Sequence, residues 1–191
     1  VASRGISAIS SVPDGTHGHA HEVDPHAWHS IPNVMRYVDN IAAGLIKADP
    51  RHAAEYRKNA TEYKRQLKAL DDRLIAQFAA LPPDRRKVIT SHDAFQYFAK
   101  RYGLTCIALQ GMNAESEPSA AAVAAVIQQV RQSGIRALFV ENISNPRLLQ
   151  QISKETEVTI GGRLYSDALS GSDGPVPTYL KMMQYNADQL I

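Results

Sequence analysis

The stretch Lys87-Val88-Ile89-Thr90-Ser91-His92-Asp93, followed by residues 94–103, decides the fold. The short apolar run at 87–90 predicts a strand. The residues after it predict a helix over 94–102, which Gly103 closes. A strand therefore leads directly into a helix, and His92 lies just after the predicted strand.

The same alternation continues to the end of the chain. We expect further strands at 104–109, 136–140 and within 158–165, and helices at 120–132, 146–156 and 177–190. This order predicts an α/β fold with a parallel sheet, right-handed crossovers and helices on both faces. Five glycines in the second half of the chain are interpreted as turn residues: Gly111, Gly161, Gly162, Gly171 and Gly174.

Three side chains that can bind metal lie directly after predicted strands. They are His92, Glu141 and Asp167. In a parallel sheet the carboxyl ends of the strands meet at one edge, where ligands bind. Each residue alone has an ordinary interpretation as a helix cap or a charge partner. Together, an imidazole and two carboxylates indicate a transition-metal site at this edge.

The residues before the sheet are predicted to be largely helical. Apolar residues at helical spacing predict one helix over 31–48, and Asp49-Pro50 interrupts the pattern. A second helix, about 45 Å long, is expected from residue 51 to 81 and ends at Pro82-Pro83. Its length favours a strut between two lobes. The predicted domains are 1–49, the linking helix 50–82, and an α/β lobe at 83–191.

Histidines cluster ahead of the first predicted helix, in and before the segment Asp24-Pro25-His26-Ala27-Trp28-His29-Ser30. His26 and His29 share a face if Pro25 begins a helix, and one of them is expected to be a ligand. The other is either exposed or orients a partner. The His17, His19 and His21 loop either binds metal loosely or is a solvated loop, and both interpretations stay open.

Composition narrows the function classes. The chain has 191 residues, a net charge of +2, 44% hydrophobic and 21% charged residues, which is ordinary for a globular protein. It has no basic cluster interleaved with aromatics, so no nucleic-acid partner is expected. The single cysteine, Cys106, excludes an intrachain disulfide and a multi-cysteine zinc site. No catalytic motif is present, and a metal-dependent hydrolase with Glu141 as the base is the alternative to a binding protein.

Four segments together resemble the zinc- and manganese-specific solute-binding proteins of bacterial ABC transporters: Asp24–Trp28, Ser91–Phe98, Phe139–Asn142 and Tyr165–Leu169. The resemblance implies two α/β lobes joined by a long helix, with one metal ion held between them. It also implies delivery to a membrane permease in the periplasm, or at the cell surface on a membrane anchor. His26, His92 and Asp167 then look like ligands, and Glu141 like a carboxylate that coordinates the metal or lies beside it.

One departure from the family pattern affects the expected affinity. Members carry a further histidine ligand early in the amino-terminal lobe, on a segment that precedes anything in this sequence. We therefore expect a truncated amino-terminal lobe, a weakened site and possible self-association through uncovered apolar surface. Zn²⁺ is favoured over Mn²⁺ as the bound ion, because imidazole ligands and the general affinity order both favour zinc. Coordination by Glu141 as well would favour Mn²⁺, because it adds carboxylate oxygens to the site.

Overall fold

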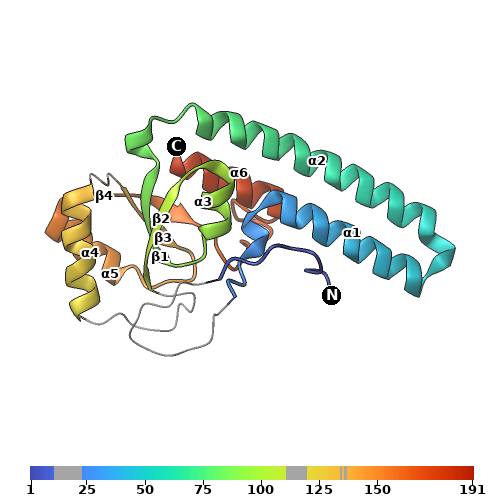
Figure 1. Ribbon diagram of the computed structural model, residues 1–191, viewed down its shortest axis with the longest axis horizontal. Coiled ribbons are helices and arrows are strands. Elements are labelled where there is room, and N and C mark those ends of the chain that lie inside the picture. Colours follow the sequence, from blue (N-terminus) through green and yellow to red (C-terminus); the bar gives the residue numbers. More distant parts are fainter. Residues whose placement is uncertain (11–22, 111–119, 134, 136) are drawn as a thin grey trace. The chain divides into compact units, whose positions relative to one another are not determined.

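The computed structural model describes residues 1–10, 23–110, 120–133, 135 and 137–191. These residues form two compact units, Val1–Arg73 and Leu74–Ile191. The boundary falls inside helix α2, which spans Ala53–Ala79 and so contributes residues to both units (Figure 1). At 1.5 Å per residue, α2 is about 40 Å long.

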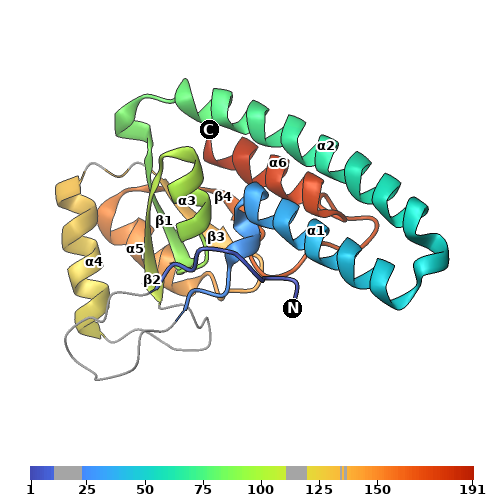
Figure 2. The same cartoon turned by 45° about the vertical axis from the view of Figure 1, so that its right-hand side comes forward.

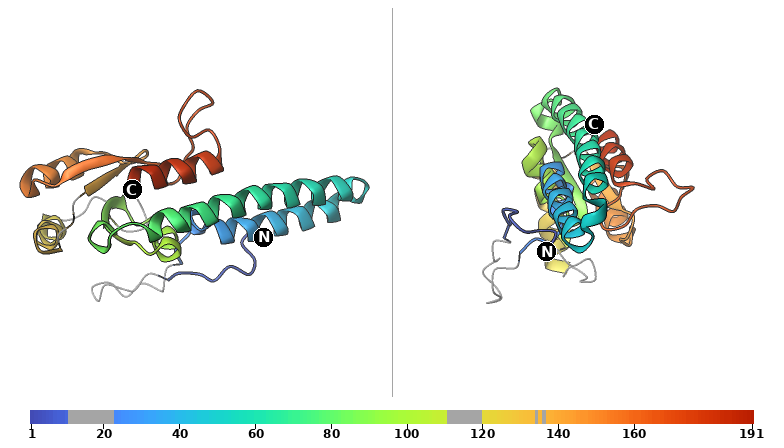
Figure 3. Two further views of the ribbon diagram at one scale, coloured as in Figure 1. Left: turned by 90° about the horizontal axis from the view of Figure 1, so that it is seen from above. Right: turned by 90° about the vertical axis from the view of Figure 1, so that its right-hand side faces the viewer.

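The first unit is built on two helices. Helix α1 covers Ile31–Ala48, which are the predicted bounds, and Pro32 lies in its first turn, where a missing backbone N–H costs nothing. A 3₁₀ turn at Pro50–His52 leads into α2. The start of α2 lies beside α1 (Figure 3), and the Lys64 ammonium lies 2.5 Å from the Asp39 carboxylate across the pair.

The second unit contains a parallel four-stranded sheet, as predicted. Its strands are β1 (Lys87–His92), β2 (Thr105–Gln110), β3 (Ala137–Glu141) and β4 (Thr159–Leu164). Its helices after α2 are α3 (Gln96–Tyr102), α4 (Ala120–Ser133), α5 (Arg147–Thr156) and α6 (Tyr179–Leu190). The α/β fold class is therefore confirmed.

The strand order is β2-β1-β3-β4. The two central strands are therefore β1 and β3, which end at His92 and Glu141. From β1 the chain moves outward to β2, and it then crosses back to β3 on the other side of β1. The direction of winding reverses between β1 and β3. In doubly wound sheets a crevice opens at the carboxyl ends of such a strand pair, and ligands bind there.

Apolar side chains pack on both faces of the sheet. On one face, Ile89 and Leu138 form a core with residues of α4 and α5, which neighbour each other in Figure 2. A second cluster joins the end of α2 to α3: the Phe78 ring lies 5.5 Å from those of Phe98 and Tyr102. Such ring pairs add about 1 kcal/mol each beyond the area that they bury. These contacts fix the sheet that positions the site.

The predicted roles of two glycines are wrong. Gly161 and Gly162 lie inside β4 and not in turns. A Cβ atom on Gly161 would lie 3.0 Å from the Phe139 ring, so the missing side chain lets that ring pack closely against β4. Gly103, in contrast, ends α3 in the left-handed conformation at φ 74°, as expected. Cys106 lies in β2, and burial raises the pKa of its thiol to about 12, which makes it unreactive.

Candidate metal site

His92 and Glu141 meet where the two central strands end. Each is the last residue of its strand, β1 or β3, because both strands run slightly further than predicted. The His92 backbone N–H donates to Glu141 Oε1 at 2.8 Å, and Glu141 Oε2 lies 2.5 Å from His92 Nδ1. Both side chains are about 1% exposed or less. The carboxylate therefore holds the histidine at its backbone and at its ring.

Asp167 approaches the other side of the same imidazole. Its Oδ2 atom lies 3.1 Å from His92 Nε2, and its side chain is 29% exposed. Burial lowers the pKa of His92, but hydrogen bonds to Asp167 and Glu141 outweigh that effect and raise the pKa to about 9. At pH 7 the His92 ring is therefore expected to carry a proton, with the Glu141 carboxylate on one side of the ring and the Asp167 carboxylate on the other. Within the second unit, the fold brings His92, Glu141 and Asp167 together.

The fourth predicted ligand, His26, lies in the first unit and has a similar local arrangement. Asp24 Oδ1 accepts a hydrogen bond from the His26 backbone N–H at 2.8 Å and lies 2.7 Å from His26 Nδ1. Both side chains are buried. A carboxylate on Nδ1 fixes the ring and makes Nε2 the nitrogen through which a metal would be bound.

The segment around His26 differs in detail from its prediction. The helix begins at Ala27 instead of Pro25, and it is a single 3₁₀ turn ending at His29. The Trp28 ring centroid lies 5.4 Å from that of His26 and 5.9 Å from that of His29. His29 is fully buried, so the alternative that it is exposed is wrong. His17, His19 and His21 lie outside the described residues.

Glu141 is predicted either to coordinate the metal or to lie beside it, and in the structure both of its carboxylate oxygens contact His92. One lies on the backbone N–H and one on the ring. This is the arrangement in which a carboxylate orients a metal-binding histidine. Sequence reasoning missed two asparagines that hold the Asp167 loop, Asn142 and Asn186. The position of Asn142 directly after Glu141 at a strand end was the available signal.

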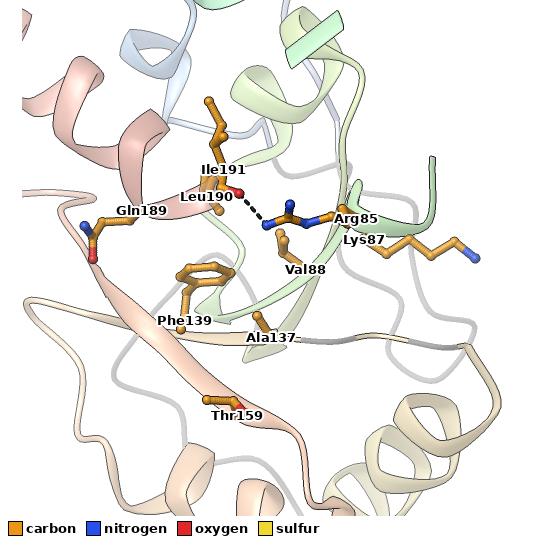
Figure 4. A pocket seen from close by; sticks show the side chains of 10 residues that line it. Arg85, Lys87, Val88, Ala137, Phe139, Thr159, Gln189, Leu190 and Ile191 are labelled. Atoms are coloured by element: carbon orange, nitrogen blue, oxygen red, sulfur yellow. Dashed lines mark hydrogen bonds between the residues drawn. The ribbon is translucent and has the colours of Figure 1, made fainter. Parts of the chain in front are cut away.

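A pocket of about 500 Å³ opens at the opposite edge of the sheet (Figure 4). It lies among the first residues of β1, β3 and β4, with Phe139 on its floor. Arg85 donates to the backbone carbonyl of Ile191 at 2.6 Å, and the Lys87 side chain extends away from the pocket in Figure 4. Its polar groups do not converge on a common point, so the carboxyl edge is the better candidate site.

Comparison with known proteins identifies a family that this chain matches. The family described as zinc-uptake complex component A, periplasmic (ZnuA) matches residues 1–191. The chain belongs to the ZnuA family. The predicted resemblance to metal-binding proteins of ABC transporters is therefore confirmed at the level of the family.

Relatives of this ZnuA-family chain carry the names of three different metals. The iron-binding protein YfeA of Yersinia pestis is 39% identical over 167 residues, which are 87% of this chain and 54% of YfeA. A manganese-bound periplasmic metal-binding protein from Candidatus Liberibacter asiaticus has a TM-score of 0.85 at 30% identity, covering 99% of this chain and 68% of that one. The periplasmic zinc-binding protein TroA of Treponema pallidum has a TM-score of 0.85 at 29% identity, covering 93% and 67%.

Two further observations concern the length of the chain and the character of its helices. The ZnuA-family chain spans about half the length of YfeA. Among the described residues, no helix combines the length and the apolar character needed to cross a bilayer.

Proposed function

We propose that this ZnuA-family chain captures a divalent transition metal and passes it to the permease of an ABC transporter. The observation that carries the proposal is the Glu141–His92–Asp167 arrangement at the carboxyl edge of the sheet. It presents one oriented imidazole nitrogen to a carboxylate that is partly open to solvent. This is a ligand pair suited to binding and releasing a cation.

In this proposal His92 binds through Nε2 and Asp167 through a carboxylate oxygen. His26 is proposed as a further ligand, because Asp24 holds its ring as Glu141 holds that of His92. Glu141 orients His92 and supplies the negative charge that compensates the bound cation. Delivery takes place in the periplasm or, for a membrane-anchored protein, at the cell surface.

Zn²⁺ is the favoured cargo and Mn²⁺ the alternative. Imidazole ligands favour zinc, and zinc stands above manganese in the general affinity order. The names of the relatives include iron, manganese and zinc, so they support a transition metal without selecting one.

A metal-dependent hydrolase is the alternative from another class, with Glu141 as general base. A base must reach the water that it activates. Both Glu141 oxygens lie against His92, which favours an orienting role instead. We expect no metal-dependent turnover of generic ester or phosphate substrates; a measurable rate would support the hydrolase.

Calorimetric titration with Zn²⁺ and Mn²⁺ tests the proposal. The chain should bind one ion saturably, and His92→Ala or Asp167→Ala should weaken binding by more than about 100-fold, since losing a ligand exceeds the 10–100-fold cost of losing an orienting partner. Asp167 is partly exposed, so its variant keeps the test valid if His92→Ala fails to fold.

His52→Ala is the matched control. His52 also contacts a carboxylate, Asp49 at 2.6 Å, but its side chain is 59% exposed. Its replacement should leave affinity unchanged. One result would contradict the proposal: weak binding at several sites that is unchanged in the His92 and Asp167 variants. Such binding would be assigned to the histidine loop if it disappeared when His17, His19 and His21 were replaced together.

A further inference from the structure

The Asp167 carboxylate is carried on a short segment that follows β4. Tyr165, Ser166 and Ala168 surround it in the chain, and none belongs to a helix or strand. A ligand on an irregular segment must be held by other contacts if it is to keep a defined position. Two asparagine side chains from different elements provide those contacts.

Asn186 holds the segment from helix α6. Its Oδ1 atom accepts a hydrogen bond from the Tyr165 backbone N–H at 2.9 Å, and its Nδ2 group donates to the Tyr165 carbonyl at 2.7 Å. The amide thus satisfies both backbone groups of one residue, which replaces the pairing that a strand would give. Asn186 is fully buried, as this role requires.

Asn142 holds the same segment from the end of β3. Its Oδ1 atom accepts from the Ser166 N–H at 3.2 Å, and its Nδ2 group donates to the Ala168 carbonyl at 3.2 Å. These two contacts bracket Asp167, one residue before it and one after it. The Asn142 backbone N–H also donates to the carbonyl of Leu164 at 2.9 Å, which extends the β3–β4 pairing up to the segment.

We propose that Asn142 and Asn186 are positioning residues that fix Asp167 for metal capture. This inference rests on the proposed function, because it concerns the site that would bind the ion. The consecutive residues Glu141 and Asn142, at the end of β3, then position different ligand groups. Glu141 fixes the imidazole of His92, and Asn142 fixes the backbone on both sides of the carboxylate. The spacing of the two ligand groups is set by the sheet before metal arrives.

The test compares Asn142→Ala and Asn186→Ala with the control Asn145→Ala. Asn145 also accepts a backbone hydrogen bond, from Arg147 N–H at 3.1 Å, but it holds the start of α5 and not the Asp167 segment. Affinity for Zn²⁺ should fall about 10–100-fold in the first two variants and remain unchanged in the control. Asn142 is only half-buried, so replacing it should disturb folding less than replacing Asn186. The Asn142→Ala variant therefore still tests the proposal if Asn186→Ala does not fold.

Two readouts separate positioning from general destabilisation. The visible absorption spectrum of the Co²⁺-saturated protein reports the coordination geometry, and it should change in the two variants. Hydrogen exchange of the Tyr165 and Ser166 amides in the metal-free protein should become faster. Affinity and spectra matching those of Asn145→Ala would overturn the proposal, as would unchanged exchange.

Failure of the positioning role and failure of the proposed function give different results. If the unsubstituted chain binds Zn²⁺ saturably and the two asparagine variants bind it equally well, only the positioning role is wrong. If the unsubstituted chain shows no saturable binding, the proposed function is wrong, and the positioning role falls with it.

Discussion

Two buried histidines among the described residues are held by carboxylates, and the two pairs are built differently. In the first unit, one oxygen of Asp24 serves both the backbone N–H and the ring Nδ1 of His26. In the second unit, Glu141 divides the same two contacts with His92 between its two oxygens. An amide retains one carbonyl oxygen, so it can reproduce the first arrangement but not the second. The difference predicts unequal responses to the same chemical substitution.

Among the effects that distinguish these two pairs, the largest is expected to be the dependence of metal affinity on pH. His92 has a pKa raised to about 9 in the metal-free protein, so it is mostly protonated at pH 7 and must lose this proton to bind metal. Affinity should therefore rise about tenfold per pH unit up to pH 9, or about 100-fold from pH 7. Calorimetry at pH 7 in buffers of different ionisation enthalpy should show about one proton released for each ion bound.

The same raised pKa has the opposite consequence for stability without metal. Protonation of His92 stabilises the folded metal-free protein fully below the unfolded pKa of about 6.5, and this contribution is lost as pH rises towards 9. Thermal unfolding of the metal-free chain at pH 6 and pH 9 checks the sign. Proton release near zero at pH 7 would show that His92 is already neutral and would contradict both expectations.

Glu141→Gln should produce the next largest effect. Its single carbonyl oxygen can accept from the His92 backbone or from the ring but not from both, and the negative charge is lost. Zn²⁺ affinity should fall about 10–100-fold, and the proton released at pH 7 should decrease because the pKa of His92 falls. Titration by calorimetry measures both quantities. Unchanged affinity would show that Glu141 does not orient His92.

Asp24→Asn should have the smallest effect. The remaining carbonyl oxygen can keep both contacts with His26, so we expect a loss in Zn²⁺ affinity below about tenfold. Asp24→Ala removes both contacts and serves as the matched comparison, with an expected loss in the 10–100-fold range. Equal losses in the two Asp24 variants would mean that charge, and not the shared oxygen, determines the contribution of this pair.

The spacing of apolar residues in the sequence was sufficient to predict most of the helices and strands. Helix α1 has its predicted bounds, and the strand–helix alternation correctly predicted the parallel sheet. Gly161 and Gly162 are predicted in turns because glycine is common there, but both lie in β4, where the Phe139 ring packs against Gly161 and the Gln189 side chain against Gly162. Propensity describes local preference, and these tertiary contacts override it.

The candidate site was predictable in its residue types but not in its contacts. His92, Glu141 and Asp167 could be found because each lies where a strand ends. The separate contacts of Glu141 with His92 and of Asn142 with the Asp167 segment could not be predicted, because they depend on which strands are neighbours and on their register. Asn186 lies in the middle of α6, 21 residues from its partner Tyr165, and nothing in its local sequence distinguishes it.

The order of the strands also bears on when each histidine acquires its environment during folding. Asp24 and His26 are two residues apart, so their contacts form as soon as one turn of chain does. His92 and Glu141 are separated by 49 residues, and β2 and α4 lie between them in the chain. Closing that long loop is slow compared with forming a local turn. The contacts that orient the His92 imidazole therefore require β3 to have paired with β1, whereas those of His26 require only a local turn.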